Sequence, residues 1–165
     1  MNRSSREGFT LIEYIIVILV VGVIAAVLGA LIIQGVRAFD SIAAREALMT
    51  EAEAAAEKMS REIRNAGSSA DIVEADSNTF NFTDIYGDGI KYYTEGKLLM
   101  RNEKILAANI KSADFFYYDK QNIEITPPLS EERFIDIHLV GIKLVFSDRG
   151  QEAAIETKIR PRNFR

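Results

Sequence analysis

Residues 8–13 read Gly-Phe-Thr-Leu-Ile-Glu, and residues 14–36 continue as YIIVILVVGVIAAVLGALIIQGV, without one charged side chain. An α-helix rises about 1.5 Å per residue, so the apolar run covers about 35 Å, enough to cross the hydrocarbon core of a bilayer. The preceding segment, MNRSSREG, carries Arg3 and Arg6. Positive charge on a short flank keeps that end in the cytoplasm, so we expect the chain after Val36 to lie outside.

Glu13 stands at the start of this apolar helix. A carboxylate costs about 2.5–3.5 kcal/mol at the centre of a bilayer, and acids inside a membrane usually have a function. A cleavable secretory signal is one alternative, but it needs a short apolar core followed by a small-residue cleavage site. The apolar run here is longer and continues into a helical pattern, which leaves a plain signal anchor as the stronger alternative.

The segment Gly8 to Ala26, together with its basic leader, resembles the type IV prepilin family, whose signature is Gly, then Phe-Thr-Leu-Ile-Glu, then an apolar helix. The resemblance implies that a membrane-embedded prepilin peptidase cuts between Gly8 and Phe9 and N-methylates the new Phe9 amine. It also implies that Glu13 meets the Phe9 amine of a neighbouring subunit in a filament. A buried ion pair of this kind is a good device for fixing register.

Small residues follow one face of the apolar helix, with Gly22, Ala26 and Gly29 at spacings of four and three. Such a stripe lets membrane helices approach one another closely. From residue 37 to residue 67 the pattern becomes amphipathic, with apolar residues near every third or fourth position. Gly67 is expected to end this helix as its C′ residue.

The period changes after Gly67, and alternating apolar and polar residues predict antiparallel strands. Strands over 79–85 and 90–94 flank a Gly-Asp-Gly turn, and 98–101 follows. A second hairpin is predicted over 113–118 and 123–125. Residues 135–146 predict one strand whose apolar phase slips near Gly141, which indicates a bulge or a bend there. Residues 153–160 predict a last strand with one charged face.

The order of these pieces resembles the minor pilin W and pseudopilin J group. The resemblance covers residues 59–165 and rests on a Gly-Asp-Gly hairpin, Leu-Leu-Met-Arg, Ala-Asn-Ile before an aromatic strand, and a terminal Ile-Arg-Pro-Arg-Asn. It implies a subunit of a type IV pilus or type II secretion system.

Composition excludes several other classes of protein. The 165 residues include no Cys and a single His, and their net charge is −4. The absence of Cys excludes disulfide frameworks and thiolate zinc sites, and the negative net charge argues against a nucleic-acid-binding protein, which would carry a basic face. His138 has no nucleophile motif around it, so we interpret it as structural, and we expect no enzyme.

Asp84 and Asp88 flank the Gly-rich turn, where the resemblance makes a calcium site conceivable because some pseudopilins bind calcium. Two carboxylates are too few for the usual six to eight oxygen ligands. We therefore favour a plain hairpin turn and expect no metal or other cofactor.

The predicted fold is α+β, with a long N-terminal helix packed on an antiparallel β-sheet head, as in pilins. The predicted divisions are a leader (1–8), an apolar transmembrane or filament-core helix (9–36), an amphipathic half (37–67) and a periplasmic head (68–165). The predicted function is a minor pilin or pseudopilin of a bacterial inner membrane, partnered by prepilin peptidase and by other pilins or pseudopilins. The alternative is a signal-anchored periplasmic binding or sensor domain that does not polymerise.

Overall fold

A computed structural model describes residues 10–164 of the chain. Its first element is the 54-residue helix α1 (Leu11–Arg64), and all later secondary structure is β or short 3-10 helix. The contacts divide the chain into two compact units, Met1–Ile42 and Ala43–Arg165. The predicted α+β fold is confirmed. The buried core residues of the described chain all lie in the second unit.

The described part of the first unit is helical, and its apolar side chains are exposed. Its most apolar window has a mean hydropathy of 3.3 and no buried residue. By length and composition this is the one described helix that could cross a membrane. The second half of the helix is rich in Ala and Glu, which favour helix, and no proline interrupts 11–64.

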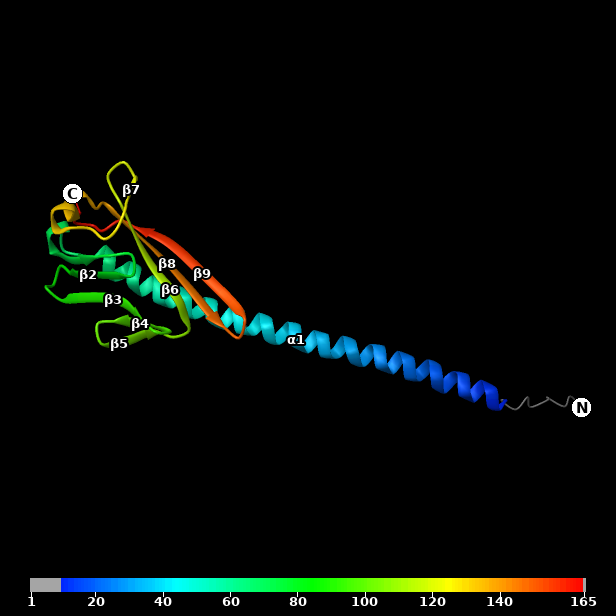
Figure 1. Cartoon of the computed structure of the whole chain (residues 1–165). Coiled ribbons are helices and arrows are strands. Elements are labelled where there is room, and N and C mark those ends of the chain that lie inside the picture. The colour runs from blue at the N-terminus through cyan, green and yellow to red at the C-terminus, as the bar shows by residue number, and fades with distance from the viewer. Residues whose placement is uncertain (1–9, 165) are drawn as a thin grey trace, which may run out of the picture. The chain divides into compact units, whose positions relative to one another are not determined.

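The second unit contains a five-stranded antiparallel sheet in the order β1-β2-β3-β4-β5 (Figure 1). Its strands are β1 (Ile72–Ala75), β2 (Thr79–Thr83), β3 (Gly89–Glu95), β4 (Leu98–Arg101) and β5 (Lys104–Ala107). The β2–β3 hairpin and β4 match the sequence-based prediction. The edge strands β1 and β5 were not predicted, because each has only four residues and no clear alternation.

A four-stranded antiparallel sheet follows in the order β7-β6-β8-β9 (Figure 1). Its strands are β6 (Ile110–Tyr118), β7 (Glu124–Ile125), β8 (Leu139–Asp148) and β9 (Gln151–Ile159). Two short 3-10 helices, η1 (Ser69–Asp71) and η2 (Glu131–Asp136), complete the elements. The predicted hairpin of β6 with β7 and the last strand are confirmed.

One hydrophobic core joins the C-terminal half of α1 to both sheets. The helix contributes six buried residues at helical spacing, Leu48, Ala52, Ala55, Ala56, Met59 and Ile63. The small alanines let the helix lie close to the strands. An aromatic cluster connects the two sheets, since the Phe80 ring lies 5.8 Å from that of Phe115 and 5.7 Å from that of Tyr117.

The predicted bulge at Gly141 is wrong. β8 pairs with β6 and β9 in unbroken register through Gly141, which faces Phe116 and Lys158. The alternation of apolar residues changes because residues 135–146 are not one strand. Ile135 belongs to η2, and β8 begins only at Leu139, after His138. Gly141 is required for another reason: a Cβ there would lie 3.2 Å from Phe116 Cβ and from Tyr118 Cε2.

The prediction for Gly67 also needs correction. α1 ends at Arg64. The next two residues make 3-10-type hydrogen bonds to the carbonyl three residues earlier, from Asn65 N to Glu62 O and from Ala66 N to Ile63 O. Gly67 does not have the left-handed backbone of a C′ glycine. Its N–H donates to Thr83 O, and a Cβ there would lie 2.6 Å from Asp71 Oδ2 and 3.3 Å from Thr83 O, so glycine makes room for the Asp71 side chain and for β2.

Candidate functional site

The predicted cleavage and methylation residues, Gly8 and Phe9, lie outside the described residues. The nearest described site residue is Glu13, in the first turn of α1, where its side chain is exposed. A carboxylate in the first turn is favoured by the positive end of the helix dipole. No charged side chain follows it until Arg37. Glu13 is therefore a lone anion at the start of a long apolar surface.

The small-residue stripe lies further along the same helix. Gly22, Ala26 and Gly29 are four and three residues apart, so they share one face of α1. A Cβ added at either glycine would meet nothing within 4 Å in this chain. The stripe is thus free of intrachain contacts at its two glycines, and another helix can approach there closely.

Asp84 and Asp88 form a closed turn. One carboxylate oxygen of Asp84 accepts hydrogen bonds of 2.9 Å from the N–H groups of Tyr86 and Asp88. The carboxylate therefore stabilises the turn backbone, as Asp does in Asx turns. Across residues 10–164 there is no group of three or more His, Cys, Asp or Glu side chains that could hold a metal.

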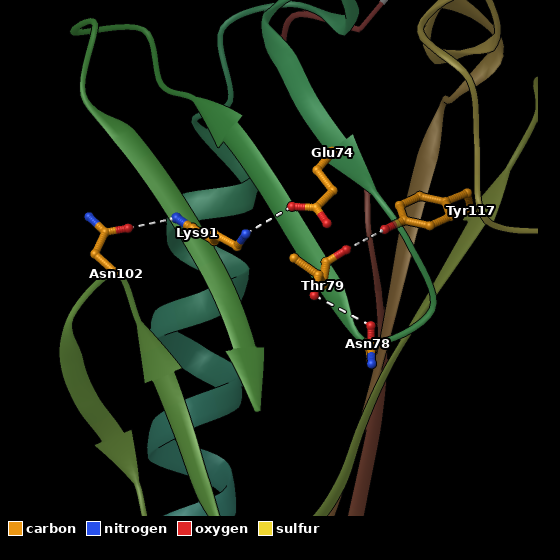
Figure 2. A network of polar contacts seen from close by, with 6 residues as sticks. All are labelled: Glu74, Asn78, Thr79, Lys91, Asn102 and Tyr117. Atoms are coloured by element: carbon orange, nitrogen blue, oxygen red, sulfur yellow. Dashed lines mark hydrogen bonds and ion pairs between the residues drawn. The ribbon is translucent and has the colours of Figure 1, made fainter. Parts of the chain in front are cut away.

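A polar network covers the outer surface of β2 and β3 (Figure 2). The Lys91 ammonium lies 2.9 Å from the Glu74 carboxylate, and both side chains are more than two-fifths exposed. Asn102 occupies the left-handed region at φ 54°, which Asn tolerates better than most residues. Its side chain accepts from Lys91 N and donates to Gly89 O, so it locks the β4–β5 turn onto β3.

Tyr117 points from β6 toward the start of β2 (Figure 2), and its hydroxyl donates to Asp76 O at 2.8 Å. Burial raises the pKa of Tyr117, and the negative charges of Asp76 and Glu74 raise it further. This tyrosine is a buried structural donor, because its proton is held more firmly than in solution. Sequence patterns could place it in the core but could not identify its acceptor.

His138 is 6% exposed and lies where two hollows of about 500 and 270 Å³ meet. Burial lowers its pKa, and the cations Lys120 and Arg160 lower it further, against smaller opposite effects of Asp119 and Asp136. Both effects favour the neutral imidazole over the protonated form. The sequence indicated a structural histidine; the hollows on both sides of it were not predictable from periodicity.

Residues 3–29 match a family model described as the prokaryotic N-terminal methylation motif. This motif belongs to the type IV prepilin and pseudopilin class and implies processing by prepilin peptidase. Such proteins are typically structural and not enzymatic. The motif beside an apolar helix suggests a membrane anchor with an extracytoplasmic head. No curated protein matches this chain.

Proposed function

We propose that this chain is a minor pilin or pseudopilin, a structural subunit of a type IV pilus or a type II secretion system in a bacterial inner membrane. The observation that carries the proposal is the methylation motif over residues 3–29, which includes the start of the apolar helix α1, whose apolar side chains are exposed there. An exposed apolar surface of this size needs lipid or other helices to cover it.

In this proposal the four divisions of the chain have separate tasks. Residues 1–8 are a leader removed at Gly8, residues 9–36 lie in the membrane or the filament core, 37–67 support the head, and 68–165 form it. Phe9 becomes the methylated N-terminus. Cleavage on the cytoplasmic side leaves the apolar helix attached, so the product stays in the membrane until it assembles.

Assembly would use Glu13 and the small-residue stripe. Pairing of Glu13 with the Phe9 amine of a neighbour neutralises two charges in a medium where an isolated charge is costly. Gly22, Ala26 and Gly29 allow the close helix packing that such a filament requires. The proposal includes membership of the minor pilin W and pseudopilin J group, on the basis of the sequence resemblance over residues 59–165.

The test is the chemical identity of the N-terminus. Mass spectrometry of protein extracted from membranes that contain active prepilin peptidase should find N-methylated Phe9 as the first residue. A Gly8→Val variant should keep Met1, because a branched Cβ at this position hinders entry of an extended backbone into a narrow protease site. Intact wild-type Met1 in such cells would overturn the proposal and favour a non-polymerising signal anchor.

A further inference from the structure

Two neighbouring hollows lie beside His138 in the head. They share Asp119, Lys120 and His138, and they lie where the β6–β7 loop, η2 and the residues after β9 meet. The larger measures about 500 Å³ and the smaller about 270 Å³. We call these two hollows together the His138 trough. Its size suits a stretch of peptide better than a single small ion.

Two cations of the trough have no carboxylate partner. Neither Lys120 nor Arg160 forms an ion pair with any residue in the described part of the chain. A third cation, Arg133, is 3.4 Å from Asp136. Positive charge is therefore available in the trough although the whole chain carries a net charge of −4.

The remaining anion, Asp119, is already engaged. One of its carboxylate oxygens accepts hydrogen bonds from the N–H groups of Gln121 and Ile123, at 2.9 and 2.8 Å. These bonds stabilise the β6–β7 loop and use part of the carboxylate's capacity to accept hydrogen bonds. Asp119 is thus a loop-stabilising group, and its effect on the pKa of His138 is smaller than those of Lys120 and Arg160.

The His138 imidazole is almost buried and yet has no hydrogen-bond partner among residues 10–164. No fully buried polar side-chain atom of the described residues lacks a partner, so the ring nitrogens are open to the trough. An open imidazole near two unpaired cations can accept a proton when an anion arrives, because the anion offsets the repulsion from Lys120 and Arg160.

The walls of the trough also offer apolar surface. Ile125, Leu139 and Phe164 line it, and Ile135 at its rim is 67% exposed. Ile123, in the same β6–β7 loop, is 63% exposed. A lining that contains both cationic and apolar groups fits a ligand that carries both acidic and apolar side chains.

From these observations we propose that the His138 trough binds an acidic peptide segment of another protein, with a carboxylate seated between Lys120 and Arg160 over His138. Apolar side chains of the same segment contact Ile135 and its neighbours. This contact belongs to the head and goes beyond assembly through the N-terminal helix. It depends on neither cleavage at Gly8 nor pairing at Glu13.

The single histidine makes a direct test possible. The full chain in nonionic detergent, with ¹³C-labelled histidine, gives one ring signal whose titration reports the pKa of His138. A blocked peptide of alternating Asp and Leu should raise this pKa by about one unit, the effect of an opposite charge within about 4–6 Å. The same peptide with Asn in place of Asp should leave it unchanged.

Matched variants separate the trough from general charge effects. The exposed pair Lys120→Gln and Arg160→Gln should abolish the peptide-dependent shift. The double change Lys97→Gln and Lys104→Gln alters the net charge equally outside the trough and should retain it. An undiminished shift in the first variant overturns the proposal. An equal shift with inorganic phosphate also overturns it, since the trough would then bind any small anion. The absence of any peptide-dependent shift in the wild-type chain overturns it as well.

Discussion

Glu62 of α1 and Arg101 of β4 form an ion pair across the head, with 2.7 Å between Arg101 Nε and Glu62 Oε2. The same carboxylate oxygen accepts a hydrogen bond from the hydroxyl of Tyr92 on β3. Both charged side chains are largely buried, at 20% and 27% exposure. One helix residue is thereby bonded to two adjacent strands.

Replacing Glu62 by Ala should lower the free energy of unfolding of the head by about 1–3 kcal/mol, because Arg101 and Tyr92 lose a charged partner in a shielded site. Glu57→Ala is a matched control on the same helix, since the ion pair of Glu57 with Arg61 is about 70% exposed. We expect it to cost about 0–1 kcal/mol.

The measurement is chemical unfolding of a fragment that begins at Arg37. We expect this fragment to be folded and monomeric because all the buried apolar residues of the described chain lie between Leu48 and Phe164. Circular dichroism should show mixed helix and sheet. Equal losses in the two variants would contradict the role assigned to Glu62, and aggregation would contradict the expectation for the fragment.

Gly141→Ala should destabilise the same fragment by about 1–3 kcal/mol, because the new methyl group would press on Phe116 and Tyr118 in a packed sheet. Gly89→Ala is the control: it is also at a strand position, with open space around its Cα and no left-handed backbone. Its unfolding midpoint in denaturant should equal or exceed that of the parent fragment. A neutral Gly141→Ala would show that the aromatic side chains relax freely.

The head should lose stability as the pH rises above about 10, because burial raises the pKa of both Tyr92 and Tyr117 in the folded state. Above the ordinary tyrosine pKa the unfolded chain releases protons that the folded chain keeps, so alkali favours unfolding. Tyr117→Phe should reduce the slope of stability against pH between about pH 9 and 11. Tyr86→Phe, at a side chain that is 78% exposed, should leave the slope unchanged.

Glu13→Val should leave membrane insertion, cleavage at Gly8 and head folding intact, since Val enters a bilayer more easily than Glu. It should sharply reduce incorporation into a filament or tip complex, because the neighbour's Phe9 amine would lose its partner. Co-purification with partner pilins at matched expression measures this. Glu53→Val removes an exposed carboxylate from the head half of α1 and should have no such effect. Undiminished incorporation of the Glu13 variant would favour a role as an interfacial helix cap.

The long helix, the methylation motif and most of the strands could be predicted from the sequence alone, because these features depend on residues close together in the chain. A charge-free run from Tyr14 to Val36 and the alternation of Phe80 and Phe82 are local signals. The tertiary structure alone decided the joining of Glu62 to Arg101, the space that Gly141 leaves for Tyr118, and the trough around His138. These features unite residues from separate elements, and their geometry depends on how helix and strands pack together, which no local periodicity records.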